Sequence, residues 1–210
     1  NQENPMTTPL RVGLAGLGTV GGGVVKLLTE HKDLLAQRAG RPIVLAGVSA
    51  LELPKALESQ LKGVAWHKDA RTLAVSSDID VMVELIGGAE GIAKQIAEAA
   101  LGAGKSLVTA NKALIAKHGV ALARTAAEKG VSLQFEASVA GGIPILKAIR
   151  EGLAANQFTR VYGILNGTCN YILTGMEESK RDFADVLAEA QKLGYDEADP
   201  AADVDGHDAA

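Results

Sequence analysis

The sequence predicts an α/β protein with a doubly wound parallel sheet, followed by part of an α+β domain. Three observations lead to this prediction. A glycine-rich turn in Arg11–Val25 joins an apolar segment to a helix-periodic one. Short, nearly all-apolar segments then alternate with helical segments, as in parallel sheets covered on both faces. After Glu136 this alternation gives way to a proline-containing turn and more polar segments.

Residues 9–137 are predicted to form the first domain. Its expected strands are the apolar segments 10–15, 42–48, 80–86, 106–109 and 131–135. Helices are expected from the glycine turn to Gly40 and at 53–62, 89–104 and 113–129. The first of these helices is predicted to bury one apolar face, made of Val24, Val25, Leu27, Leu28, Leu34 and Leu35.

Residues 138–210 are predicted to form a second part with mixed elements. A helix should follow Pro144 and run to about Ala155, and the alternation in 158–165 predicts a strand. The hydroxyl of Thr168 is expected to cap a helix that ends near Met176. An amphipathic helix at 182–193 should then lead into an acidic loop at 195–210.

Composition limits the classes of protein to consider. Of the 210 residues, 47% are hydrophobic and 22% are charged, which allows a substantial core and argues against wholesale disorder. No apolar run approaches the roughly 20 residues of a membrane-spanning helix. The single cysteine, Cys169, excludes an internal disulfide framework and is typical of a cytoplasmic protein. The net charge is −4 without a basic stripe, so neither nucleic acid nor a membrane is an expected partner.

The glycine turn has the spacing Gly16-x-Gly18-x-x-Gly21 between a strand and a helix. Gly16 permits the tight turn, Gly18 lets the backbone approach a pyrophosphate, and Gly21 lets the helix pack against the strand. Free N–H groups at the helix start attract phosphate. A structural turn without a ligand is the alternative. The flanking elements favour a Rossmann-like dinucleotide site.

The residues after the second strand leave the choice of nucleotide open. An acid at this place binds the ribose 2′-hydroxyl of NAD, whereas a basic residue accepts the 2′-phosphate of NADP. Glu52 stands slightly late for the first role, and Lys55 could serve the second. Both residues are equally well explained as solvated loop charges.

Three further positions are candidates for chemistry. Lys112 follows a strand at the edge where open sheets bind ligands, although a lysine there can be a plain surface charge. Glu136 precedes a turn whose carbonyls suit a hard cation, although it could simply cap that turn. Cys169, with His207 as a base, is a candidate nucleophile, although single cysteines are usually inert.

The end of the sequence concentrates carboxylates that could hold an ammonium-bearing substrate. A solvated acidic surface is the alternative, and the spacing required of an EF-hand calcium loop is absent. The acidic residues concerned are Glu197, Asp199, Asp203, Asp205 and Asp208.

Four segments together resemble the homoserine dehydrogenases: 108–112, 136–144, 163–173 and 190–208. The resemblance covers nearly all of residues 10–210. It implies reversible, NAD- or NADP-dependent conversion of L-homoserine into L-aspartate 4-semialdehyde, a step towards threonine and methionine. It also implies a cytoplasmic homo-oligomer. Residues 138–210 would then be a truncated portion of the substrate-binding and dimerisation domain.

The resemblance also implies roles for individual residues. The dinucleotide would be held by Gly16, Gly18, Thr19, Val20 and Gly21. Lys112 would lie at both the nicotinamide and the substrate, with Asp203 as a second catalytic residue. Glu197 and Asp208 would bind homoserine. A sodium ion would be bound by Glu136 and the carbonyls of Val139, Gly141 and Ile143.

Two departures from the family pattern matter. Family members carry a lysine four residues after the position of Asp208, taken as the general acid, and this sequence ends at Ala210. We therefore expect this chain to be catalytically incomplete. Many members also carry an arginine where Leu51 and Glu52 stand, so a simple NADP preference does not follow. A non-catalytic dinucleotide-binding module and a Cys169-dependent semialdehyde dehydrogenase remain the alternatives.

Overall fold

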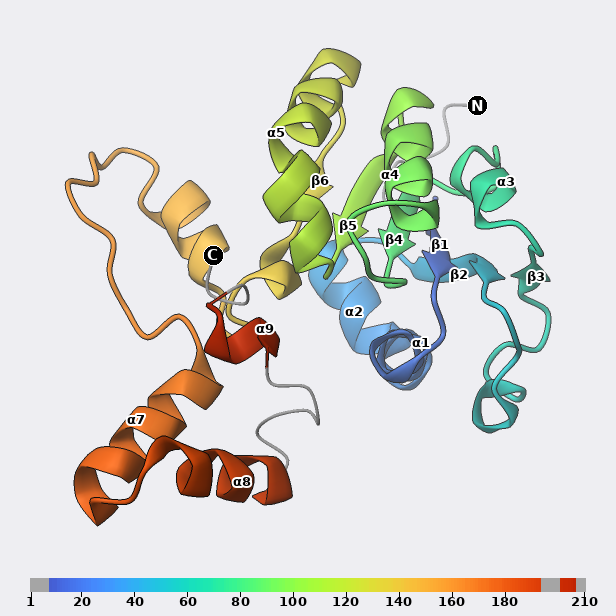
Figure 1. The fold of residues 1–210 in the computed structure, drawn as a ribbon. Coiled ribbons are helices and arrows are strands. Elements are labelled where there is room, and N and C mark those ends of the chain that lie inside the picture. The colour runs from blue at the N-terminus through green and yellow to red at the C-terminus, as the bar shows by residue number, and fades with distance from the viewer. Residues whose placement is uncertain (1–7, 194–200, 207–210) are drawn as a thin grey trace. The chain divides into compact units, whose positions relative to one another are not determined.

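The computed structural model describes residues 8–193 and 201–206 (Figure 1). The chain divides into two compact units, and the division falls between Gly152 and Leu153. The predicted domain boundary after residue 137 lies earlier in the chain and stays a prediction. Each unit is described separately below.

The first unit is built on a six-stranded sheet with the order β3-β2-β1-β4-β5-β6. All of its paired strands are parallel. The sequence prediction of a doubly wound parallel sheet is thereby confirmed. The strands are β1 (Leu10–Ala15), β2 (Ile43–Ser49), β3 (Ala65–Trp66), β4 (Val81–Glu84), β5 (Ser106–Thr109) and β6 (Leu133–Gln134).

The strand order changes direction between β1 and β4, because the chain fills one side of β1 before it crosses to the other. Ligands bind at such a switch point, outside the carboxyl ends of the strands. In β1 the residues from Val12 to Ala15 are all buried, as expected for a strand that is covered on both faces.

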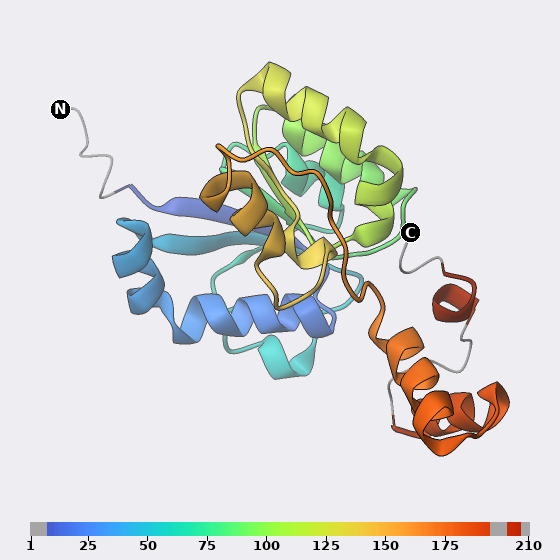
Figure 2. The same cartoon turned by 90° about the vertical axis from the view of Figure 1, so that its left-hand side faces the viewer.

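Helices cover both faces of the sheet (Figures 1 and 2). One face carries α1, whose Val25 packs with Leu14 and Val48 of the strands. The other carries α4 and α5, whose Ile96 and Leu114 pack with other strand residues. The helices of this unit are α1 (Thr19–Glu30), α2 (Lys32–Ala39), α3 (Ala70–Ala74), α4 (Ile92–Gly102), α5 (Lys112–Lys129) and α6 (Ile145–Lys147).

Three short turns complete the first unit. They are the 3-10 turns η1 (Lys55–Leu57) and η2 (Glu136–Ser138) and the π-helical turn η3 (Ala148–Gly152). The prediction of a helix at 53–62 was wrong, because this stretch forms only the turn η1. Of its side chains, only those of Leu57 and Leu61 reach the core. The helix predicted to reach Ala155 ends at η3.

The helix predicted after the glycine turn is broken in two. It stops at Glu30 and restarts at Lys32, with His31 between the two pieces. This break ends the continuous apolar face that the sequence pattern suggested. The predicted burial of Leu27 and Leu34 was wrong, since both side chains are exposed, and α2 buries no residue fully.

In the second unit, α7 (Gly167–Ser179) and α8 (Phe183–Leu193) form a helical hairpin. Their shared core contains Ile172, Val186 and Ala190. A third helix, α9 (Ala201–Val204), lies within the stretch predicted to be an acidic loop.

Two predictions for the second unit were wrong. Residues 158–165 form no strand, because a strand needs a partner for its backbone groups and none pairs with it among the described residues. Apolar side chains of this stretch, such as Val161 and Ile164, are exposed. The cap of α7 is also not Thr168. The Asn166 side chain accepts a 2.7 Å hydrogen bond from the Cys169 N–H instead.

Candidate functional site

The glycine turn has the geometry that each of its three glycines predicts. Gly16 has φ +97°, and a Cβ there would lie 2.4 Å from the carbonyl oxygen of Leu85. A Cβ at Gly21 would lie 1.9 Å from the carbonyl oxygen of Gly16, so this glycine lets α1 pack against the end of β1. A Cβ at Gly18 would meet nothing within 4 Å, which leaves open space at the helix start.

The start of α1 is left available to an anion. Its N-cap residue is Gly18, so no side chain caps the first turn. The first N–H groups of a helix have no partner within the helix and carry a partial positive charge. Thr19 and Val20 are the first two residues of this helix. The family resemblance implied that both hold the dinucleotide.

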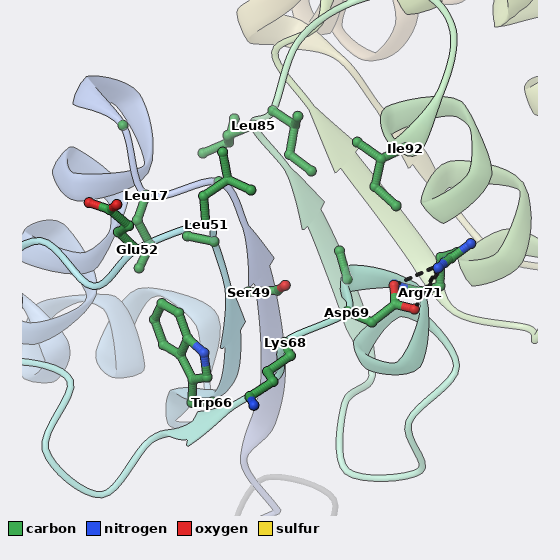
Figure 3. Close-up of a pocket in the computed structure, with 15 residues that line it drawn as sticks. Leu17, Ser49, Leu51, Glu52, Trp66, Lys68, Asp69, Arg71, Leu85 and Ile92 are labelled. Atoms are coloured by element: carbon green, nitrogen blue, oxygen red, sulfur yellow. Dashed lines mark hydrogen bonds and ion pairs between the residues drawn. The ribbon is translucent and has the colours of Figure 1, made fainter.

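A cavity of about 940 Å³ adjoins the glycine turn (Figure 3). Its walls come from the carboxyl ends of β1, β2 and β4 and from the residues that follow β3. Trp66 lines it, as does Glu52, whereas Lys55 does not. The lining residues are Gly16, Leu17, Gly18, Ser49, Ala50, Leu51, Glu52, Trp66, Lys68, Asp69, Ala70, Arg71, Leu85, Ile86 and Ile92.

Two of the charged residues in this cavity neutralise each other. The Arg71 Nε lies 2.9 and 3.0 Å from the two carboxylate oxygens of Asp69. The hydrogen bonds from the Arg71 side chain and backbone hold the pKa of Asp69 below its usual value. Asp69 also caps α3 by accepting a bond from the Arg71 N–H.

A buried carboxylate, which sequence reasoning missed, organises the loop after β4. Glu84 is fully buried at the end of this strand. One of its oxygens accepts hydrogen bonds from the N–H groups of Ile86 and Gly87, at 2.7 and 3.1 Å. The other accepts a 2.6 Å bond from the Thr109 hydroxyl, at the end of β5. The signal in the sequence was a lone acid within the apolar residues 81–86.

The same network continues into the start of α5. The Thr109 hydroxyl accepts a bond from the Asn111 N–H, and the Asn111 amide donates to the Gly88 carbonyl at 2.7 Å. The side-chain oxygen of Asn111 caps α5 by accepting from the Leu114 N–H. Lys112 is the first residue of this helix and is exposed at the carboxyl edge of the sheet, as predicted.

The Glu136 carboxylate acts as a helix cap. Its two oxygens accept 2.9 Å bonds from the N–H groups of Leu146 and Lys147, at the start of α6. Among the described residues, no group of three or more acidic, histidine or cysteine side chains could hold a metal ion. The sodium site that the resemblance implied, with Val139, Gly141 and Ile143, therefore stays a prediction.

In the second unit, Asp203 is tied to the start of α7. Its carboxylate accepts a 2.7 Å bond from the Asn166 side-chain amide. The Cys169 thiol donates to the backbone carbonyl of Asp203 at 3.1 Å. The predicted substrate ligands Glu197 and Asp208 lie outside the described residues, as does His207.

The sheet order, the glycine turn and the adjoining cavity define a dinucleotide-binding domain of the Rossmann class. Comparison with known protein families gives the same class. Residues 16–136 match the family described as homoserine dehydrogenase, NAD binding domain, and residues 144–210 match homoserine dehydrogenase. The chain belongs to the homoserine dehydrogenase family.

Individual relatives agree with this assignment. The chain is 48% identical over 201 residues to a homoserine dehydrogenase from Neisseria gonorrhoeae, with 96% of this chain and 46% of the relative covered. It is 50% identical over 202 residues to one from Pseudomonas aeruginosa, with the same coverage. The chain thus spans about half the length of the curated relatives it matches.

Solved structures show the same fold. A homoserine dehydrogenase from Thiobacillus denitrificans has a TM-score of 0.84 at 45% identity, covering 97% of this chain and 47% of that one. A hyperthermophilic archaeal homoserine dehydrogenase in complex with NADPH has a TM-score of 0.81 at 26% identity, covering 96% of this chain and 66% of that one. Neither alternative function from the sequence is supported by these matches.

Among the described residues, no helix is both long enough and apolar enough to cross a bilayer.

Proposed function

We propose that the protein interconverts L-homoserine and L-aspartate 4-semialdehyde, with NAD(H) or NADP(H) as its hydride carrier. The observation that carries this proposal is the glycine turn, which opens onto a large cavity at the switch point of the sheet in a chain of this family. Support for the nucleotide also comes from the archaeal relative, whose solved structure contains NADPH.

The turn fits a dinucleotide in two respects. The open space beside Gly18 admits a pyrophosphate, and the first N–H groups of α1, which no side chain caps, are suited to bind it. In this proposal Gly16, Gly18, Thr19, Val20 and Gly21 bind the pyrophosphate. The nicotinamide, when bound, supplies or accepts the hydride at the substrate carbon.

Lys112 is proposed to act on the substrate oxygen. Lys112 begins α5 directly after β5, at the sheet edge where the nicotinamide end of a dinucleotide is expected. A cation there stabilises the negative charge that develops on that oxygen during hydride transfer to the aldehyde. The hydrogen bonds among Glu84, Thr109 and Asn111 orient the first turn of α5 and thus the backbone of Lys112.

Carboxylates of the second unit are proposed to bind the amino group of the substrate. Glu197 and Asp208 are the two assigned to this role by the family pattern. Carboxylates satisfy the ammonium group of homoserine with opposite charge. Asp203, whose carboxylate accepts a bond from the Asn166 amide, is proposed as a second catalytic residue.

A sodium ion, homo-oligomerisation and a cytoplasmic location complete the proposal. Glu136 and the carbonyls of Val139, Gly141 and Ile143 offer only oxygen ligands, which a hard cation prefers. Ala140 and Gly142, between these carbonyls, have φ +47° and +84°, so this turn departs from regular backbone. The Glu136 oxygens retain lone pairs beyond their two bonds to backbone N–H groups.

The test is the homoserine-dependent reduction of NADP⁺ and NAD⁺, followed by absorbance at 340 nm. We expect Lys112→Ala to lower kcat/KM by about 100-fold, the usual effect of removing one stabilising donor from a transition state. Lys129→Ala is the matched control, because Lys129 is an exposed lysine in the last turn of the same helix.

Two results would count against the proposal. Turnover of homoserine that is equal in Lys112→Ala and in the control would remove Lys112 from the reaction. Because this chain is expected to be catalytically incomplete, the assay uses the protein extended to the length of its relatives. Absence of homoserine-dependent reduction in that folded protein would contradict the proposed activity itself.

A further inference from the structure

The cavity beside the glycine turn contains a buried hydroxyl that no other described residue bonds. Ser49 is the last residue of β2, is 3% exposed and lines this cavity. Figure 3 shows its side chain among the lining residues. Its hydroxyl makes no hydrogen bond to any other described residue, although its backbone carbonyl accepts one from the Gly16 N–H. A buried hydroxyl of this kind is unfavourable unless a ligand or water satisfies it.

A cation lies on the same side of the cavity. In the parallel register of β2 and β3, Val48 pairs with Trp66, and the His67 N–H donates to the Val48 carbonyl at 2.8 Å. Lys68 therefore leaves the sheet directly beside the end of β2. Its ammonium group forms no ion pair within the described part of the chain, whereas the nearby Arg71 is neutralised by Asp69.

We propose that Ser49 and Lys68 bind the 2′-phosphate of NADP(H) and so select this nucleotide over NAD(H). The inference rests on the proposed function, because it assumes that a dinucleotide occupies the cavity. The end of the second strand faces the adenosine ribose in this fold, and a basic residue there accepts the 2′-phosphate. Here the cation comes from the residues after β3, and the Ser49 hydroxyl donates a second bond to the phosphate.

Glu52 is the competing determinant, since a carboxylate would bind the 2′-hydroxyl of NAD instead. Figure 3 shows Glu52 beside Leu17, whereas Lys68 lies with Trp66 on the β3 side of the cavity. Ser49 ends β2, and Lys68 follows the neighbouring strand β3. A hydroxyl and an ammonium group at the ends of adjacent strands favour a phosphate. The Trp66 ring lines the same wall and offers an apolar surface to the adenine.

A pair of small nucleotides tests the inference without catalysis. The compounds 2′,5′-ADP and 5′-AMP differ only in the 2′-phosphate, and Trp66 is the single tryptophan of the chain, so its emission reports on the cavity. Calorimetry with the same compounds gives the affinities independently of Trp66. We expect 2′,5′-ADP to bind at least about tenfold more tightly, which corresponds to one charge-assisted hydrogen bond.

Substitutions then assign this preference to residues. Lys68→Gln should remove most of the tenfold ratio, and Ser49→Ala should reduce it. Lys55→Gln is the matched control, because Lys55 is an exposed lysine between the same two strands that does not line the cavity. It should leave the ratio unchanged.

The possible failures are distinguishable. If the unmodified protein binds 5′-AMP as tightly as 2′,5′-ADP, the inference is overturned while the proposed function stands. The same holds if Lys68→Gln leaves the ratio intact and Glu52→Gln changes it. If neither these compounds nor NADPH and NADH bind to the folded protein, both the inference and the proposed function fail.

Discussion

Gly21 and Gly23 lie two residues apart in α1 but have opposite surroundings. A Cβ at Gly21 would overlap the backbone carbonyl of Gly16, whereas a Cβ at Gly23 would meet nothing within 4 Å. We predict that Gly21→Ala lowers the free energy of unfolding by about 2 kcal/mol or more, because α1 must move away from β1. Gly23→Ala should instead stabilise the helix by up to about 1 kcal/mol.

Urea unfolding followed by circular dichroism measures both effects, and nucleotide titration of each folded variant adds a second comparison. Gly21→Ala should also bind nucleotide more weakly, since the shift changes the position of the N–H groups at the start of α1. Equal effects of the two substitutions on the free energy of unfolding would contradict the prediction that close packing at Gly21 stabilises the fold.

Individual residues differ in how far the sequence alone could predict them. The roles of Gly16, Gly18 and Gly21 follow from local spacing, since turn, helix start and strand are contiguous in the chain. The role of Glu84 could not be predicted in this way. Its hydroxyl partner, Thr109, lies 25 residues later and becomes a neighbour only when β4 pairs with β5.

At the scale of elements, Glu90 connects the loop before α4 to α5. Its carboxylate lies 2.7 Å from the Lys117 ammonium group and 3.0 Å from the His118 ring. The hydrogen bond from Lys117 has the largest effect, and together with that from His118 it lowers the pKa of Glu90 from 4.5 to about 2. Because the folded pKa is below the unfolded one, the carboxylate stabilises the fold above about pH 4.5, and this contribution is lost as the pH falls towards 2.

We therefore predict a pH-dependent stability difference between the unmodified protein and Glu90→Gln. The unmodified protein should be the more stable near neutral pH, and the difference should shrink as the pH falls below about 4.5. Urea unfolding over a pH series measures it. Glu128→Gln, which removes an exposed carboxylate from α5, is the control. A Glu90→Gln difference that does not change with pH would refute the assigned ion pair.

The elements that the sequence predicted best are those whose signal is local. The parallel strands β1 and β5 are short runs with apolar centres, and both were predicted with the observed bounds. The alternating stretch at 158–165 carries a similar local signal. It nevertheless forms no strand, because strand formation depends on a partner that a local pattern does not contain.

At the scale of the whole first unit, parallel strands bring distant segments of the chain to one edge. The glycine turn follows β1, Ser49 ends β2, Glu84 ends β4, and Lys112 follows β5. Because all these strands are parallel, their carboxyl ends lie at the same edge of the sheet. The position of Lys112 at this edge could therefore be predicted from strand order alone.

The wall of the cavity that contains Lys68 could not be predicted in the same way. It depends on β3, a strand of two residues, which is too short to give a periodic signal in the sequence. Trp66 and Lys68 thus join the candidate site only through the pairing of β3 with β2.

The central claim is that the glycine turn and the adjoining cavity bind a nicotinamide dinucleotide. Isothermal titration calorimetry of the folded chain with NADPH and NADH tests it most directly. We predict saturable binding with a stoichiometry of one nucleotide per chain, weakened in Gly21→Ala and retained in Gly23→Ala. Absence of saturable binding of both nucleotides to a chain that is folded by circular dichroism would contradict the claim.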